Sequence, residues 1–346
     1  MKSRKSVLLL AAAVVLIAVL AGVGAAFLED RSPKEFPVRT TGSDASVSAP
    51  ASVSAPVSAP ATTEPDVDFS GTVELDGVRY RLNTSLQAIL FLGVDDGGGF
   101  VPGVAPGEGR RADTIFLFLL DDQSKTNRLL AISRDTIADV DVYQANGDYA
   151  YTAPTHINMQ YYYGDSPSRS CFLMKRSISR LLYGMRIDGC LSMNAQGIIT
   201  IVDELGGLTV TMPEDYTDID PRYQAGAELT LTGAETEHLL RYRDLSSHGS
   251  NEDRVERQVR LIKSLVERLQ AGMSAERLKQ LLDAAGDEVC SDLDAETLKK
   301  LVSYRLDSQT LTLPGEIVAG ADHDEFHLDE SALRRLLIEL FYQPTE

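Results

Sequence analysis

Apolar and polar residues alternate or cluster along the chain in patterns that predict its secondary structure. Nearly continuous apolar runs at residues 88–94, 114–120 and 128–132 are typical of strands buried on both faces of a sheet. Residues 72–82 alternate around Asp76-Gly77, a dipeptide that favours a two-residue hairpin turn. We therefore predict a hairpin followed by three core strands.

Helical spacing of apolar residues dominates the rest of the chain. Capping residues help to place the helix starts: Asn194 precedes one segment, and Thr232 with Glu235 forms a capping-box pattern. The predicted helices cover residues 168–182, 195–205, 251–270 and 329–342, with others starting at Thr232, Ser274 and near Asp294, and a strand at 310–313. Because strands and helices are interleaved, we expect one mixed α/β domain over residues 70–346, with a central mixed sheet flanked by helices.

The N-terminus has the pattern of a membrane anchor. Residues 1–5 contain Lys2, Arg4 and Lys5, and residues 6–28 are uncharged and apolar, close to the roughly 20 residues that cross a bilayer. The positive flank predicts a cytoplasmic N-terminus and an extracytoplasmic domain. A cleaved signal peptide is the alternative, although its apolar region is usually only about 7 to 15 residues long.

Residues 29–69 contain few large apolar side chains. This segment is rich in Ser, Ala, Pro and Thr and includes the near-repeat SVSAPASVSAPVSAP. Such a composition cannot bury enough apolar surface to fold, so we expect a linker between the anchor and the domain.

The composition and the absence of certain motifs exclude some classes of ligand and of enzyme. A formal charge of −18 argues against nucleic-acid binding, which requires an excess of Lys and Arg. The three cysteines, Cys171, Cys190 and Cys290, leave open both a disulfide and unpaired thiols. The sequence contains no GxSxG, HExxH, Walker A or GxGxxG motif, so hydrolase, zinc-protease and nucleotide sites of those kinds have no support.

Acidic residues stand where two predicted strands meet loops. Asp95 and Asp96 follow the first core strand, and Asp113 precedes the second. If these strands are neighbours, Asp95 and Asp113 could share a hard cation such as Mg2+, which prefers carboxylate oxygens. A solvated turn is the alternative, since Asp and Gly are common turn residues.

Arginines stand at other element ends. Arg134 follows the third core strand, and Arg241 and Arg243 would point the same way if their segment is extended. Arg254 and Gln258 share one face near the start of a predicted helix, a location that favours anions. Arginine suits a diphosphate because the guanidinium donates paired hydrogen bonds, but each arginine could instead pair with surface carboxylates.

The order of several motifs resembles the LytR-CpsA-Psr family over about residues 85–272. These motifs are ILFLGVDD, GRRADTIFLFLL, LLAISRDT, THINMQYYYGD, GIITIVDELGGLTV, AGAELTLTGAETEHLLRYR and DRVERQ. The resemblance implies a membrane phosphotransferase that moves teichoic acid, capsular polysaccharide or a related glycopolymer from a polyprenyl diphosphate carrier to peptidoglycan through a phosphodiester. It also implies a mixed sheet flanked by helices and an apolar channel for the lipid tail.

The resemblance assigns roles to individual residues. The metal ligands, for Mg2+ or Mn2+, fall on Asp95 and Asp113. The diphosphate-binding residues fall on Arg111, Arg134, Arg241, Arg243, Arg254 and Gln258. Asn251 replaces the family's acidic residue near the helix arginine, so we assign the general base to Asp253, with Arg134 and Arg254 as the other catalytic residues.

Two other functions fit the same motifs. A hydrolase would use water instead of a sugar hydroxyl as the acceptor of the phosphoryl group. A non-catalytic lipid-binding or glycan-binding wall protein would bind the same groups without turnover.

Overall fold

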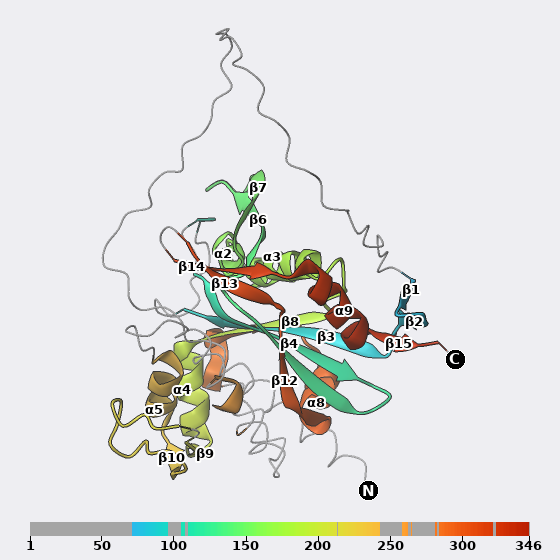
Figure 1. Ribbon diagram of the computed structural model, residues 1–346. Coiled ribbons are helices and arrows are strands. Elements are labelled where there is room, and N and C mark those ends of the chain that lie inside the picture. The colour runs from blue at the N-terminus through green and yellow to red at the C-terminus, as the bar shows by residue number, and fades with distance from the viewer. Residues whose placement is uncertain are drawn as a thin grey trace, which may run out of the picture.

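The chain folds around a six-stranded mixed sheet with helices on both faces (Figure 1). The computed structural model describes residues 71–95, 105–107, 110–212, 214–242, 258–261, 264, 281, 284–320 and 323–345. The strand order is β11-β8-β3-β4-β5-β12. The bounds are β3 Leu86–Val94, β4 Ala112–Asp121, β5 Thr126–Ile132, β8 Gly189–Asn194, β11 Val289–Ser291 and β12 Arg305–Thr312. Strands β3, β4 and β5 pair antiparallel, whereas β8 and β12 join the two sides in parallel pairs.

Both faces of the sheet are buried because the core strands carry apolar residues at nearly every position. Phe91 and Phe118 point to one face, where their rings meet edge to face with centroids 5.8 Å apart. Leu90 and Leu117 point to the other face and are fully buried. The sheet is therefore the middle layer between two separate apolar cores.

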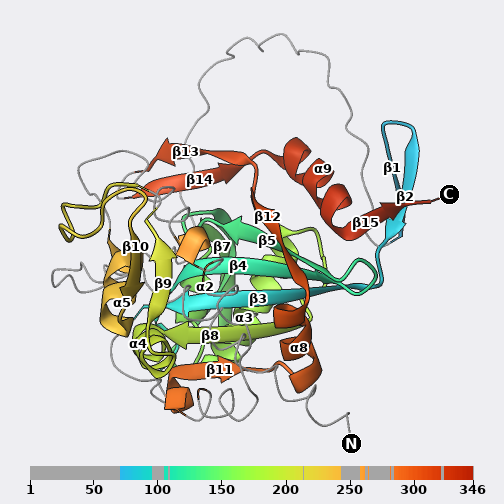
Figure 2. The ribbon, with the colours of Figure 1, turned by 90° about the horizontal axis from the view of Figure 1, so that it is seen from below.

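Helices α4, α5 and α8 and the β9–β10 hairpin cover the face that carries Phe91 (Figure 2). Their bounds are α4 Ala195–Glu204, β9 Leu208–Thr211, β10 Glu228–Leu231, α5 Gly233–Arg241 and α8 Ala295–Ser303, with a short 3-10 turn η1 at Gly286–Glu288. Asn194 Oδ1 accepts the Gly197 N–H at 2.9 Å, and Thr232 and Glu235 complete the capping box at the start of α5.

The opposite face is covered by α2, α3 and α9, with two further hairpins on the same side (Figure 1). The bounds are β6 Ile137–Tyr143, β7 Tyr149–His156, α2 Met159–Tyr162, α3 Pro167–Leu181, β13 Gly315–Ala319, β14 Asp324–Leu328 and α9 Glu330–Phe341. A small sheet formed by β1 Thr72–Leu75, β2 Val78–Leu82 and β15 Tyr342–Pro344 lies at one edge, so the two ends of the folded domain are paired.

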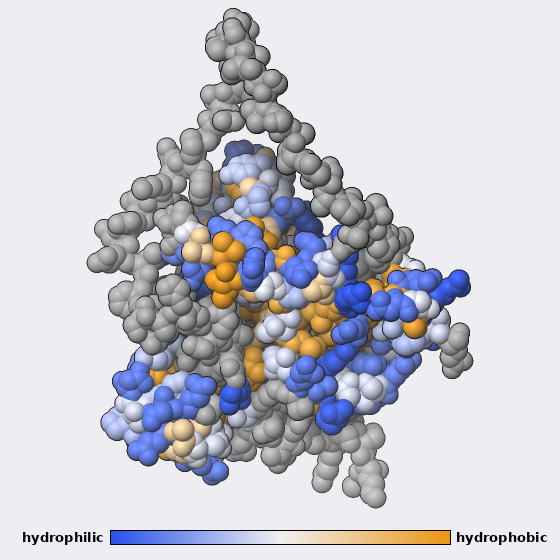
Figure 3. Space-filling view, viewed as in Figure 1, coloured by the Kyte–Doolittle hydropathy of each residue, from blue (hydrophilic) through white to orange (hydrophobic). Residues whose placement is uncertain are grey.

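Apolar surface gathers across the middle of the face shown in Figure 3, over β13, β14 and the sheet beyond them. Ile317 and Val318 of β13 are 44% and 41% exposed. Exposed apolar side chains are common on folded proteins, so this surface by itself indicates no function.

Most of the predicted elements are confirmed. The three core strands, the opening hairpin and the helices capped by Asn194, Thr232 and Asp294 lie where the patterns place them. The hairpins β6–β7 and β13–β14 were not predicted from the sequence. Only residues 258–261 and 264 of the predicted helix 251–270 are described, and they are helical.

The predicted anchor, linker and Ser274 helix start lie outside the described residues. Within the described part of the chain, no helix is both long and apolar enough to cross a membrane.

The central sheet should tolerate loss of a core ring poorly. We expect Phe118→Ala to lower the free energy of unfolding by about 3 to 5 kcal/mol, since Phe118 is fully buried against Phe91 and its removal leaves a cavity. Chemical denaturation would measure the change. The control Val78→Ala, at a strand position that is 43% exposed, should change stability by less than about 1 kcal/mol, and equal losses in the two variants would contradict this view of the core.

Candidate active site

A β-bulge sets the position of Asp113 at the end of the β3–β4 pair. Val94 pairs with Ala112 and Gly93 pairs with Thr114, so Asp113 is the extra residue between them. Bulges re-aim side chains and often occur beside active sites. Here the bulge brings a carboxylate that is only 3% exposed to the carboxyl end of β3.

Asp95 lies beside the bulge because β3 ends one residue earlier. Its Oδ1 accepts the Arg111 N–H at 2.8 Å, and its own N–H donates to the Arg111 carbonyl at 3.0 Å. Burial and the neighbouring charge of Asp113 together raise the pKa of Asp95 to about 6, against the opposing effect of Arg111. The two carboxylates therefore share one electrostatic environment, as the predicted cation site requires.

Arg134 brings positive charge to the same place from the turn between β5 and β6. One guanidinium nitrogen lies 2.9 Å from Asp113 Oδ1, and its Nε lies 3.3 Å from Asp135 Oδ1. Burial favours the neutral form of Arg134, but Asp113 and Asp135 outweigh it and raise the pKa of the guanidinium. With its side chain 17% exposed, Arg134 is a mostly buried cation that stays charged.

Asn158 completes this cluster and was not recognised as a site residue from the sequence. Its Nδ2 donates to Asp113 Oδ1 at 3.1 Å, and its main chain bonds the Arg134 carbonyl and the Ala112 N–H, each at 3.4 Å. It stands at the N-cap of α2 but makes no side-chain capping bond, because the side chain turns to Asp113 instead. The available signal was a polar residue between the β7 segment and a helix, inside the THINMQ motif.

Three polar atoms around Asp113 are buried and have no hydrogen-bond partner among the described residues: Asp113 Oδ2, Asn158 Oδ1 and Gln258 Nε2. Gln258 is 1% exposed and joins the cluster through its Oε1, which accepts from Thr114 Oγ1 at 3.4 Å. Leaving such atoms unpaired costs free energy, so a ligand that satisfies them would gain it.

The donor types of these atoms fit a divalent cation and a phosphate. Carboxylate and amide oxygens are ligands that Mg2+ accepts, and an amide N–H can donate to a phosphate oxygen. The described residues contain no group of three or more His, Cys, Asp or Glu side chains placed to hold a metal. Asp95 and Asp113 are the two described carboxylates that could hold such a cation, with Asn158 orienting the Asp113 carboxylate.

His156 and Asp135 support Arg134 from the side of β7. His156 Nδ1 lies 4.0 Å from Asp135 Oδ1, and the Asp135 carbonyl accepts the Phe326 N–H at 2.9 Å. Burial lowers the pKa of His156 despite the nearby Asp135 carboxylate, which favours a neutral imidazole at pH 7. The cluster is thus tied to both hairpins on this side of the sheet.

The structure brings together five of the residues predicted for the site: Asp95, Arg111, Asp113, Arg134 and Gln258. Arg241 is the last residue of α5 and pairs with Glu237 at 2.9 Å. Since Arg241 is helical, the extended segment that would align it with Arg243 does not include it, and its role in diphosphate binding stays a prediction. Helix α5 does lie beyond the carboxyl end of β3 (Figure 2). Arg243, Asp253 and Arg254 lie outside the described residues.

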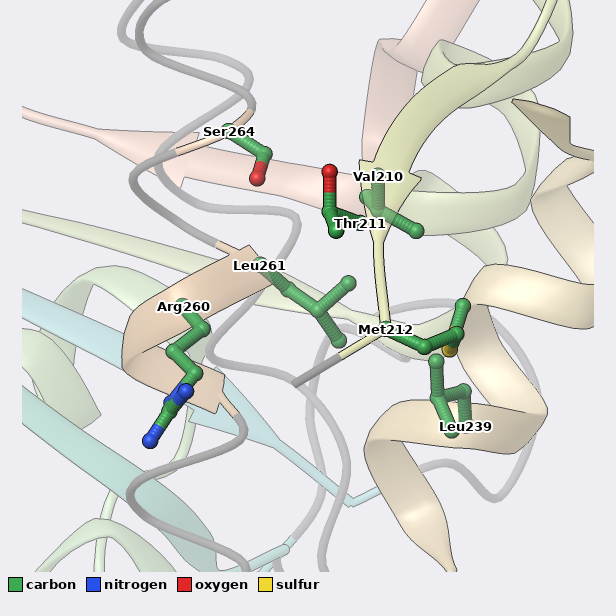
Figure 4. Close-up of a pocket in the computed structure, with 7 residues that line it drawn as sticks. All are labelled: Val210, Thr211, Met212, Leu239, Arg260, Leu261 and Ser264. Carbon is green, nitrogen blue, oxygen red and sulfur yellow. The ribbon is translucent and has the colours of Figure 1, made fainter. Parts of the chain in front are cut away.

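A small pocket lies on the side of the sheet covered by α4 and α5 (Figure 4). It is lined by Val210, Thr211, Met212, Leu239, Arg260, Leu261 and Ser264. Leu261 points toward Met212, whereas the Arg260 side chain points away from it. Leu261 lines this pocket and follows Gln258 by less than one helical turn. The apolar pocket therefore lies within a few residues of the polar cluster around Asp113.

Comparison with known proteins finds bacterial relatives that are about 25% identical in sequence to this chain. The polyisoprenyl-teichoic acid–peptidoglycan teichoic acid transferase TagV of Bacillus subtilis is 25% identical over 208 residues, 58% of this chain and 48% of TagV. The biofilm regulatory protein A of Streptococcus mutans is 23% identical over 227 residues, 63% of this chain and 53% of that protein. The chain thus spans about half the length of these relatives.

Solved structures share the fold. One of TagT bound to LIIa-WTA matches 75% of this chain and 90% of its own, with a TM-score of 0.55 and 19% sequence identity. The LytR_cpsA_psr family model matches residues 54–339, which include the elements from β1 to β14 and all but the last two residues of α9. This chain, with its bulged aspartate and buried arginine, belongs to the LytR_cpsA_psr family.

Proposed function

We propose that the protein transfers a glycopolymer, such as a teichoic acid or a capsular polysaccharide, from a polyprenyl diphosphate carrier to peptidoglycan. Membership of the family supports this function, as do the relative named as a teichoic acid transferase and the neighbour bound to LIIa-WTA. The domain would act outside the cytoplasm, held at the membrane by residues 6–28. No described contact bears on that anchor.

The observation that carries the proposal is the set of unpaired buried atoms around the Arg134–Asp113 ion pair. A structural ion pair would be expected to have its remaining acceptors satisfied by the protein. In the described part of the chain, a carboxylate oxygen, an amide oxygen and an amide N–H have no partner beside a charged guanidinium. This combination suits an anionic group bridged by a cation.

The reaction would be an in-line displacement at phosphorus. A sugar hydroxyl of peptidoglycan forms a new P–O bond to the phosphorus that carries the glycopolymer, and the P–O bond to the polyprenyl phosphate breaks. Arg134 and Arg111 would hold the phosphate oxygens, with Gln258 donating from its Nε2. We assign the proton of the attacking hydroxyl to Asp253, and further phosphate contacts to Arg241, Arg243 and Arg254.

Asp95 and Asp113 would hold Mg2+ or Mn2+, which when bound offsets the negative charge of the diphosphate. The protein's own part is to keep both carboxylates close despite their repulsion. The Arg111 N–H fixes Asp95, and Arg134 with Asn158 fixes Asp113.

Product analysis with purified lipid-linked polymer would test the proposal. With peptidoglycan present, polymer attached to peptidoglycan is expected, together with one polyprenyl phosphate for each attachment. Free polymer in equal amounts with and without peptidoglycan would identify a diphosphate hydrolase instead. Binding without any release of polyprenyl phosphate would identify a non-catalytic wall protein.

Replacement of Arg134 should impair turnover strongly. We expect Arg134→Ala to lower kcat/KM for transfer by about 10²- to 10³-fold, the effect typical of removing a group that stabilises charge in the transition state. Arg134→Lys should recover only part of the loss, since a lysine cannot donate paired hydrogen bonds. Arg222→Ala, at a 52% exposed arginine paired with Asp220 and Glu235, is the matched control and should keep normal rates.

Divalent cations should stabilise the protein in a pH-dependent way. Without a cation, Asp95 favours the folded state below its unfolded pKa of 3.8, and this contribution is lost as pH rises through about 6. A cation binds the ionised form, so the rise in Tm caused by Mg2+ should be larger at pH 7 than at pH 5. EDTA should reverse it.

Asp113→Asn should abolish this cation-dependent rise in Tm. The control Asp76→Asn, in the exposed β1–β2 turn, should keep it. A rise in Tm that is equal in both variants would place the cation elsewhere.

Asn158 should act by positioning Asp113. We expect Asn158→Ala to weaken Mn2+ binding by about 10- to 100-fold, the range found when a group that orients a metal ligand is removed. Titration followed by electron paramagnetic resonance would measure it. Loss of transfer with unchanged Mn2+ affinity would instead mean that Asn158 contacts the substrate.

A further inference from the structure

The β6–β7 hairpin and α3 carry a group of aromatic side chains around one arginine, away from the Asp113 cluster. We define the hairpin patch as Tyr143 of β6, Tyr149 of β7, and Arg169 and Phe172 of α3. Tyr149 is 56% exposed and Phe172 is 45% exposed. The hairpin projects from the body of the domain, so this surface is reachable by a large partner (Figure 1).

The rings of the hairpin patch are held in place by the protein. Tyr143 and Tyr149 are cross-strand partners whose rings meet edge to face, with centroids 5.9 Å apart. The Tyr149 hydroxyl lies 2.9 Å from Thr152 Oγ1 on the same strand. Groups that are already ordered lose little conformational entropy when a ligand binds to them.

Arg169 differs from the other basic residues of α3. The helix has four basic residues and no acidic ones, in a chain with a net charge of −18. Lys175 pairs with Asp292, and Arg176 and Arg180 pair with Asp141.

No carboxylate of the described residues pairs with Arg169. Its guanidinium carbon instead lies 5.3 Å from the ring centre of Tyr143 and 5.1 Å from that of Phe172. A guanidinium stacked on rings keeps its N–H donors available for an anion.

The chemistry of the hairpin patch matches an anionic sugar chain. The C–H groups of a pyranose face carry partial positive charge and pack on the negative face of an aromatic ring. A carboxylate or phosphate on the same chain would accept from Arg169. We propose that the hairpin patch binds the glycan strand of peptidoglycan, which is the acceptor in the proposed function on which this inference rests.

The hairpin also connects the patch to the candidate active site. Strand β6 begins three residues after Arg134, and β7 ends two residues before Asn158. Tyr149 and His156 are the first and last residues of β7 and lie seven steps apart along the chain, roughly 23 Å in a strand. A glycan strand lying along the hairpin could therefore contact the hairpin patch with one sugar while another sugar of the same strand reaches Arg134. Only a polymeric acceptor is long enough to make both contacts.

Sedimentation of the full-length protein, in detergent, with purified peptidoglycan sacculi tests the inference. We expect Tyr149→Ala and Phe172→Ala each to weaken binding by about three- to tenfold. Arg169→Ala should weaken it to a similar degree and reduce its sensitivity to salt. Ile317→Ala and Arg335→Ala, at exposed positions of β13 and α9, are the controls and should bind as the wild type does.

The results of this experiment can distinguish failure of the inference from failure of the proposed function. If the wild type releases free polymer but still binds sacculi through the hairpin patch, the transfer reaction is wrong and the glycan site stands.

The inference would be overturned if all three patch variants bound sacculi as tightly as the wild type does. It would also be overturned if the substitutions weakened binding to phosphatidylglycerol vesicles and left sacculus binding unchanged, since the patch would then face the membrane. Thermal unfolding of each variant confirms that the fold is retained.

Discussion

The ion pair between Arg134 and Asp113 is the interaction on which the rest of the site depends. A buried carboxylate is costly unless it is paired, and the described residues pair with Asp113 through one of its two oxygens. Arg134 stabilises the charge of Asp113. The β-bulge directs the Asp113 side chain toward the carboxyl end of β3. With the pair in place, Asp95 can lie close by at the expense of a raised pKa. The described part of the site is thus built from opposing charges that hold one another in place.

The neighbouring residues hold Asp113 and Arg134 in place through different contacts. Asn158 binds Asp113 with its side chain and the flanking strands with its backbone, so a single residue fixes the spacing of β4 and the Arg134 turn. Asp135 and His156 hold Arg134 from the hairpin side. The apolar faces of the sheet exclude water from beneath the cluster, and electrostatic interactions are stronger where water is excluded.

Local patterns were sufficient to predict the core strands, the capped helices and the two aspartates at strand ends. Those features depend on neighbours in sequence: Asn194 caps its own helix, and Asp95 follows its own strand. Asn158 was missed because its function depends on Asp113, 45 residues away. The β6–β7 hairpin was missed because β7 is mostly exposed and neither strand has the continuous apolar run of β3. The pattern left open whether Arg241 lies in a helix or an extended segment, because it could not show that the capped helix α5 continues through this residue.

The small sheet formed by β1, β2 and β15 determines where the chain leaves the folded domain. It lies near the start of β3, where the Asn83 N–H bonds the Phe341 carbonyl, whereas Asp95 follows the other end of that nine-residue strand, roughly 30 Å away. The 41 residues from 29 to 69 are expected to form a semi-extended tether because the segment is rich in Ser, Ala and Pro, and a fully extended chain of this length would reach roughly 130 Å. The expected reach of the linker thus exceeds the roughly 30 Å length of β3. A protein held at one end by such a linker could turn its opposite end toward the surface that holds it.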